Sequence, residues 1–280
     1  MNLGVGNSMA QGRPMISESD LKLNESLSKI KHVVIVMSGK GGVGKSTVSS
    51  NLAMSFAMKK FRTGIMDIDI HGPNIPKMFG LEDAQLAVED GKLVPVPGPN
   101  GLKVMSMAFL LPERDAPVAW RGPVKMGAIR QFIEDVAWGE LDYLVVDMPP
   151  GTGDEAISII QLIPKADGVV VVTTPQDVAL LDSRKSIVFS AQVKIPVIGI
   201  VENMSSFVCP HCGKTTDIFK TGGGERTAKE MGVQFLGRVP IEPGIAVSGD
   251  AGLPIVASAP DSVSAKAFAK IASKVIKTVG

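Results

Sequence analysis

One stretch near the amino terminus limits the folds open to this chain more than any other. Residues 33–37 form a short apolar run, Val-Val-Ile-Val-Met, and Ser-Gly-Lys-Gly-Gly-Val-Gly-Lys-Ser-Thr follows at residues 38–47. An apolar run of this length predicts a buried strand, the glycines leave the backbone free to curl, and the residues after them favour a helix. The stretch therefore predicts a strand, a phosphate-binding loop and the start of a helix.

The loop fits the pattern G-x4-G-K-[ST] without a gap. Backbone N–H groups and the positive end of a helix dipole attract an anion at such a position. We expect Lys45 to reach the outer phosphates and Ser46 to offer an oxygen to Mg2+. The plain alternative is a glycine-rich turn without a ligand. The candidate phosphate-binding residues are Gly39, Gly41, Gly42, Val43, Gly44, Lys45, Ser46 and Thr47.

A second lysine, Lys40, directly follows Gly39 in the loop. From the residues alone it is a solvated charge. However, residues 39–47 resemble the deviant phosphate loop shared by partitioning ATPases, septum-site ATPases, the nitrogenase iron protein and Mrp/ApbC-type iron-sulfur carriers. The resemblance implies that Lys40 crosses a dimer interface to touch the partner's nucleotide.

Length and composition fit one α/β domain. The chain has 280 residues, of which 45% are hydrophobic, so it can bury the core of a domain of about 250 residues. We predict a mostly parallel, doubly wound sheet with helices on both faces, as in P-loop ATPases. Residues 1–29 are expected to form a flexible tail and a short lead-in helix, and residues 30–280 the ATPase domain.

Charge and hydropathy narrow the choice of partners. The 29 basic residues nearly balance the 28 acidic ones, which argues against a nucleic-acid partner. No stretch approaches the roughly 20 apolar residues that span a bilayer, and the amino terminus lacks the apolar core of a signal peptide. We therefore expect a soluble, cytoplasmic protein that is not a membrane protein.

Acidic residues follow two of the predicted strands. Asp67 and Asp69 come after the strand that starts at Thr63, and Asp147 ends the apolar run that starts at Leu141. The carboxyl ends of parallel strands meet at the edge that faces the phosphate loop. Asp147 could hold Mg2+ through water. The resemblance implies that Asp67 lies near the metal and phosphates and that Asp69 orients the attacking water, whereas the simpler alternative is a capped turn.

Two further elements resemble the Mrp type specifically. One is the Trp-Arg-Gly-Pro sequence at residues 120–123, which is expected to open a helix running to Trp138. The other is the Pro-Pro-Gly-Thr-Gly-Asp sequence at residues 149–154, which matches the second switch of that family. Its glycines would let the backbone move when the γ-phosphate departs.

The residues expected around the base lie late in the chain. Asn203 ends a predicted strand, where members of the superfamily use an asparagine amide to read adenine. A guanine-reading Asn-Lys-x-Asp sequence is absent, which favours ATP over GTP. The segment that begins at Pro240 resembles the purine-flanking loop of the family. Asn203 as a simple turn residue remains the alternative.

The two cysteines, Cys209 and Cys212, lie three positions apart in a predicted loop. Zinc requires four ligands and a [4Fe-4S] cluster usually four thiolates, so one chain supplies too few. A two-fold dimer would bring four sulfurs to one point. The resemblance implies a labile [4Fe-4S] cluster held between subunits in this way. Zinc is the competing interpretation, and His211 as a further ligand and inert buried thiols are weaker ones.

Taken together, the chain is similar to Mrp/ApbC-type P-loop ATPases. The resemblance implies a homodimer that binds ATP, Mg2+ and a [4Fe-4S] cluster and transfers the cluster to apoproteins. One alternative is a positional ATPase of the partitioning or septum-site class that acts on membrane or DNA. The lysine-bearing last helix, predicted over residues 262–277, favours that alternative. Another is a nucleotide-binding module stapled by zinc.

Overall fold

A computed structural model gives the fold, and it describes residues 23, 25–111, 122–163, 165–209 and 211–280. Within these residues, eight strands form a central sheet in the order β12-β9-β8-β1-β7-β2-β6-β5. All neighbours pair in parallel except β5 and β6, which are antiparallel. The predicted, mostly parallel sheet is therefore confirmed. The strands are β1 Ile30–Met37, β2 Thr63–Asp67, β5 Val96–Pro97, β6 Lys103–Ser106, β7 Leu141–Asp147, β8 Ala166–Thr173, β9 Val197–Glu202 and β12 Phe235–Arg238.

Strand β1 shows why the sheet needs cover on both faces. Val33, Ile35 and Met37 belong to the core on one side of the sheet. Val34 and Val36, which alternate with them, belong to the core on the other side. Successive side chains of a strand point to opposite faces, so a continuous apolar run buries both.

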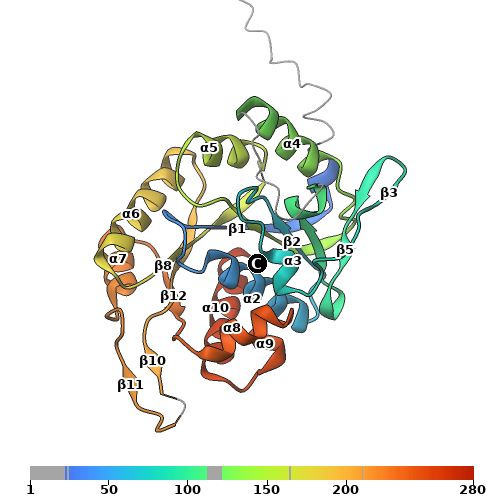
Figure 1. Cartoon of the computed structure of the whole chain (residues 1–280). Helices are drawn as coiled ribbons and strands as arrows, with labels where there is room; N and C mark the ends of the chain where they lie inside the picture. The colour runs from blue at the N-terminus through green and yellow to red at the C-terminus, as the bar shows by residue number, and fades with distance from the viewer. Residues whose placement is uncertain (1–22, 24, 112–121, 164, 210) are drawn as a thin grey trace, which may run out of the picture.

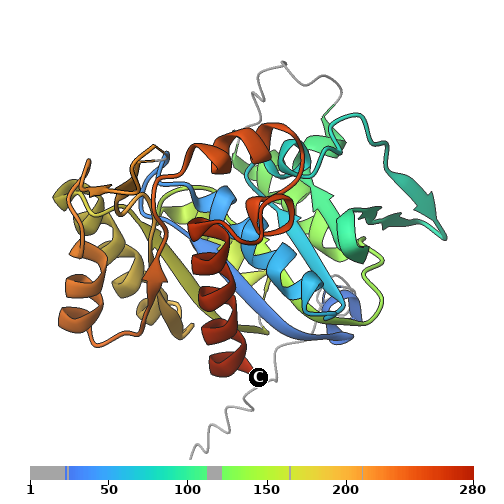
Figure 2. The ribbon, with the colours of Figure 1, turned by 90° about the horizontal axis from the view of Figure 1, so that it is seen from below.

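Helices supply that cover on each side (Figure 1). The face of Val34 packs against α2, Lys45–Met58, and α10, Val263–Val279. The opposite face packs against α4, α5 and α6. The view from below shows α2 and α10 in front of the sheet (Figure 2). The remaining helices have the bounds α3 Ile75–Met78, α4 Gly122–Glu134, α5 Asp154–Gln161, α6 Asp177–Gln192, α7 Gly223–Met231, α8 Pro243–Asp250 and α9 Ile255–Ser258. Two 3-10 turns are η1 Pro99–Gly101 and η2 Met107–Leu110.

Two small hairpins leave the main body. One is the pair β3, Ala87–Glu89, and β4, Lys92–Val94. The second pair, β10, Phe207–Val208, and β11, Thr215–Thr216, carries the cysteines and projects away from the sheet (Figure 1). The sequence predicts only a loop there, because two-residue strands leave no apolar alternation to detect.

The structure tests some of the predictions for the tail, the lead-in helix, the Trp-Arg-Gly-Pro sequence and the last helix. The tail at residues 1–22 and the Trp-Arg pair at residues 120–121 lie outside the described residues. Residues 25–28 are helical, and Leu27 is buried as the lead-in helix requires. The last helix buries Phe268 and Ile271 and leaves its lysines exposed, as predicted. Among the described helices, none has the length and apolar character to cross a bilayer.

Candidate functional site

The phosphate loop connects β1 to α2, as predicted. Gly42 and Gly44 adopt left-handed conformations with φ of 78° and 83°. A Cβ atom at Gly44 would lie 2.1 Å from Nδ2 of Asn203, so only glycine fits there. No side chain caps the N-terminus of α2. The N–H groups of its first turn therefore remain available to an anion.

Lys45, Ser46 and Asp147 come together below this loop. Nζ of Lys45 lies 2.8 Å from Oδ2 of Asp147, a fully buried carboxylate at the end of β7. The same oxygen accepts a hydrogen bond of 2.6 Å from Oγ of Ser46. A buried carboxylate next to a hydroxyl and an ammonium is the donor set that binds Mg2+ and phosphate in P-loop proteins.

Ser49 is a site residue that the sequence analysis missed. Its Oγ donates to Oδ1 of Asp147 at 2.6 Å, so both carboxylate oxygens accept from hydroxyls of α2. The helical period of the sequence could have indicated Ser49. Ser49 follows Ser46 by three positions, which places the two on the same side of a helix.

Asp67 and Asp69 both lie at this edge but differ in their contacts. Oδ2 of Asp69 is 3.8 Å from Nζ of Lys45, so Asp69 faces the phosphate loop. Asp67 is fully buried and accepts hydrogen bonds from N of Asp69, N of Ile75 and Oγ of Ser106. Burial, and then the charge of Asp147, raise the pKa of Asp67 above its ordinary value. Burial likewise raises the pKa of Asp69, which Lys45 opposes.

Lys40 differs from Lys45 in its surroundings. It is half-buried, and its backbone oxygen accepts from Oγ of Ser38 at 2.9 Å. Within the described part of the chain, its ammonium makes no ion pair, whereas that of Lys45 pairs with Asp147 and approaches Asp69.

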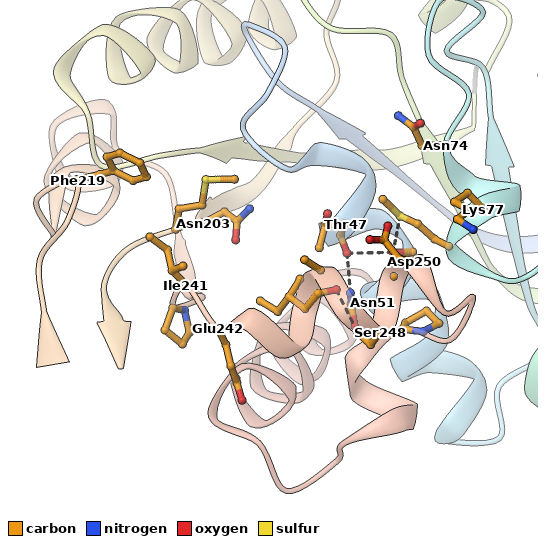
Figure 3. Close-up of a pocket in the computed structure, with 18 residues that line it drawn as sticks. Thr47, Asn51, Asn74, Lys77, Asn203, Phe219, Ile241, Glu242, Ser248 and Asp250 are labelled. Carbon is orange, nitrogen blue, oxygen red and sulfur yellow. Dashed lines mark hydrogen bonds between the residues drawn. The ribbon is translucent and has the colours of Figure 1, made fainter. Parts of the chain in front are cut away.

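A pocket of about 440 Å³ adjoins the start of α2 (Figure 3). Asn203 and Pro240, the two residues predicted around the base, line it together with Thr47 of the phosphate loop. Nδ2 of Asn203 donates to the backbone oxygen of Val43 at 2.9 Å, which ties the end of β9 to the phosphate loop. The volume is within the usual range for small-molecule sites.

Lys125 joins two loops near the site and was not singled out from the sequence. This α4 residue is 7% exposed, and its Nζ lies 2.8 Å from Nε2 of His71 in the loop after β2. The same Nζ lies 2.5 Å from Oε1 of Glu155, at the start of α5 after the second glycine-rich loop. The Glu155 oxygen accepts no aligned hydrogen bond, so this contact is an ion pair.

The cysteines lie at the tip of the β10–β11 hairpin. N of Cys209 donates to the backbone oxygen of Lys214, and N of Gly213 donates back to that of Cys209. The N–H groups of Cys212 and His211 and the thiol of Cys212 lower the pKa of the Cys209 thiol. Both cysteines are free. Among the described residues, no three His, Cys, Asp or Glu side chains gather to hold a metal ion, so His211 does not complete a site.

A family model and several curated relatives, all described as iron-transfer or iron-sulfur proteins, match most of this chain. A family model described as NUBPL iron-transfer P-loop NTPase, of the ParA group, matches residues 29–276. The "iron-sulfur cluster carrier protein" of Methanocaldococcus jannaschii is 48% identical over 273 residues, covering 98% of this chain and 93% of that protein. The protein of the same name from Saccharolobus solfataricus is 54% identical over 93% of this chain and 88% of that one. The "cytosolic Fe-S cluster assembly factor CFD1" of Chaetomium globosum is 51% identical over 78% of this chain and 77% of that one.

Solved structures resemble the fold closely. A nucleotide-binding protein from Archaeoglobus fulgidus, in complex with ADP and with cobalt found in it, has a TM-score of 0.75 and 43% identity, covering 83% of this chain and 91% of that one. The cell division ATPase MinD of Pyrococcus furiosus has a TM-score of 0.68 at 22% identity, covering 88% and 99%, which shows the shared fold alone. With its family model matched from end to end of the sheet, and relatives about half identical to it, this chain belongs to the NUBPL iron-transfer P-loop NTPase family.

Proposed function

We propose that this chain is a carrier that binds and hydrolyses ATP, holds a [4Fe-4S] cluster between two identical subunits and transfers the cluster to apoproteins. The observation that carries the proposal is a complete phosphate loop in the same chain as a pair of free cysteines, within an iron-transfer family. The names of the relatives from M. jannaschii and S. solfataricus support the cargo.

The chemistry proposed at the phosphate is positioning and charge neutralisation. The loop amides and Lys45 would hold the phosphates, and Ser46 would offer its hydroxyl to Mg2+ with Asp147 behind it. The present contacts fit this role, because the ammonium and the hydroxyl already converge on one buried carboxylate. Asp69 would orient the attacking water, and Asp67 would hold the Asp69 loop in place through its backbone bonds.

The dimer follows from the count of ligands. One hairpin offers two thiols, and a [4Fe-4S] cluster requires four ligands. Two-fold symmetry would place two hairpin tips at one point and two Lys40 side chains at each other's nucleotides. The half-buried Lys40, for which the described residues offer no ion-pair partner, supports this arrangement. Turnover would be slow, because each site needs a lysine from the partner. Hydrolysis would relax the contact between the subunits and so change how firmly the two chains hold the shared cluster.

Free thiols and the "cytosolic" name of the CFD1 relative support a cytoplasmic location, where cysteines stay reduced. The recipients would be apo forms of iron-sulfur proteins, and no nucleic-acid partner is proposed.

Anaerobic purification followed by iron, sulfide and zinc analysis tests the proposal. We expect about four iron and four sulfide per dimer, with visible absorbance of a cluster. Cys209→Ala and Cys212→Ala should each abolish that absorbance. His211→Ala is the matched control, because it changes one of the two residues between the cysteines without removing a thiol. It should retain the cluster. Stoichiometric zinc without iron would overturn the proposal in favour of a zinc-stapled module.

A positional ATPase acting on membrane or DNA is the second candidate. It is favoured by the lysines of α10, because Lys266, Lys270 and Lys277 are all exposed on that helix. Co-sedimentation with anionic liposomes or DNA in the presence of ATP separates the two functions. ATP-dependent binding together with absence of iron would favour the positional class.

A further inference from the structure

The hairpin that carries the cysteines begins and ends at the nucleotide pocket. Met204, three positions before β10 begins, and Phe219, three positions after β11 ends, both line the pocket next to α2. Phe219 and Asn203 lie on the same side of the pocket in Figure 3, across from Asn74 and Lys77. A ligand in this pocket therefore touches both ends of the segment that holds the two thiols.

Hydrogen bonds fasten these two ends to the sheet. Oε1 of Glu202, a fully buried side chain, accepts from Oγ of Ser205 at 2.5 Å and from N of Gly222 at 3.0 Å. The hydroxyls of Ser205 and Thr221 lie 2.9 Å apart. The segment before the hairpin and the segment after it are thus held by one carboxylate at the end of β9.

The hairpin beyond this root has little to hold it in one conformation. Its two strands contribute two residue pairs, one bridge joins Phe207 to Ile241, and residues 211–218 are all exposed. A two-stranded hairpin of this size is marginal on its own. The order of the tip, and hence the position of Cys209 and Cys212, depends on how firmly the root is packed.

Phe219 is the part of the root that a ligand would bury. It is an aromatic side chain that is 37% exposed at the edge of the pocket. A purine base offers a flat face that stacks on such a ring. Met204, which lines the same pocket, adopts a left-handed φ of 54° and carries a flexible thioether that can adjust to the base.

We propose that the nucleotide base, through Phe219 and Met204, orders the cysteine hairpin, so that base occupancy controls access to the thiols. The inference rests on the proposed nucleotide site and goes beyond it, because the signal comes from the base and not from the γ-phosphate. ADP and ATP should therefore order the hairpin equally. Inorganic tripolyphosphate, which can fill the phosphate loop but has no base, should not.

The experiment measures alkylation of the thiols in the full-length, reduced, metal-free chain. Iodoacetamide labelling of Cys209 and Cys212 is followed by mass spectrometry, with and without saturating ADP, ATP or tripolyphosphate. We expect ADP and ATP to slow labelling about fivefold or more, the lower end of typical coupling between sites. Calorimetry establishes saturation for each ligand and each variant.

Phe219→Ala should bind ADP more weakly. When it is saturated with ADP, its thiols should no longer be protected from alkylation. Ile218→Ala is the matched control, because Ile218 is 52% exposed, precedes Phe219 and does not line the pocket. It should retain full protection. Hydrogen exchange of the hairpin amides gives a second readout that does not depend on thiol chemistry.

Three results would overturn the inference. They are full protection in saturated Phe219→Ala, equal protection by tripolyphosphate, and unchanged labelling of the wild-type chain with bound ADP. In each case the nucleotide still binds, so the proposed function stands. Failure of the wild-type chain to bind ADP would overturn the proposed function and this inference together.

Discussion

Nζ of Lys125 lies 2.8 Å from Nε2 of His71, and this contact joins α4 to the loop that carries Asp69. Because the same ammonium pairs with Glu155, one nearly buried side chain connects the loop after β2 with the helix after β7. The sequence predicts that Asp69 in the first segment orients the attacking water and that the residues 149–154 leading into the second move with the γ-phosphate. Their mutual position therefore depends on a third element, α4.

Replacing Lys125 with methionine keeps the length of the side chain but removes its charge. Glu155 then loses its ion-pair partner, and we expect the free energy of unfolding to fall by about 1–3 kcal/mol. Urea denaturation measures the change. Lys185→Met is the control, because Lys185 has a side chain that is 70% exposed and pairs with Asp182 at the surface, so it should change stability by less than about 0.5 kcal/mol. Equal stability of the two variants would contradict the role given to Lys125.

Lys40→Ala tests the contribution of a partner subunit to hydrolysis. The variant should bind ATP, because Lys45 is intact, but hydrolyse it at least about 100-fold more slowly, since a charge that stabilises the transition state is lost. Asp69→Ala should be inactive for a different reason, loss of the group that orients water. Phosphate release measures both.

Mixing these two inactive variants distinguishes action in trans from action in cis. In a mixed dimer, the site with an intact Asp69 receives Lys40 from the other chain. Freely exchanging subunits give half mixed dimers with one working site each, so about a quarter of wild-type activity is expected. No recovery on mixing would mean that Lys40 acts on the nucleotide of its own subunit. Lys45→Ala mixed with Lys40→Ala is expected to behave in the same way as the Asp69 pair.

Asp142 makes one part of the stability depend on pH. Hydrogen bonds from Arg62 and then from Lys31 hold the pKa of its carboxyl well below the usual range. A depressed pKa contributes stability that is complete above the ordinary aspartate pKa, near about 4, and is lost as pH falls toward the lower folded value. The Arg62 side chain is 48% exposed, so solvent screens the pair and the contribution should be only about 0.5–1 kcal/mol.

Urea denaturation of Asp142→Asn at pH 6 and pH 3 checks this. The variant should be less stable than the wild type at pH 6, and the difference should shrink at pH 3. Asp261→Asn, which changes a fully exposed carboxylate, should show no such convergence. A constant difference for Asp142→Asn across this range would contradict the assigned pKa direction.

The sequence predicted most of the sheet because its strands are continuous apolar runs that end in chemically distinctive residues. Val33 to Met37 is unambiguous because both faces of β1 are buried. The phosphate loop was equally predictable, since its glycines and lysine follow a fixed spacing. Local sequence is sufficient where one segment supplies both the fold and the chemistry.

What the sequence did not predict depends on contacts between distant segments. Lys125 and His71 are 54 positions apart, and the residues next to Lys125 in the sequence do not indicate that its side chain is buried. Phe219 follows the cysteines in a stretch without a period, so its place in the pocket depends on how the hairpin returns to the sheet. The hairpin itself was missed because two paired residues on each side are too few to give an alternation.

The central claim is that two chains share one cluster, and native mass spectrometry of the anaerobically purified protein tests it most directly. The account predicts a dimer whose mass exceeds that of two chains by one [4Fe-4S] cluster, and loss of that mass in Cys212→Ala. A monomer that carries a complete cluster would contradict the account.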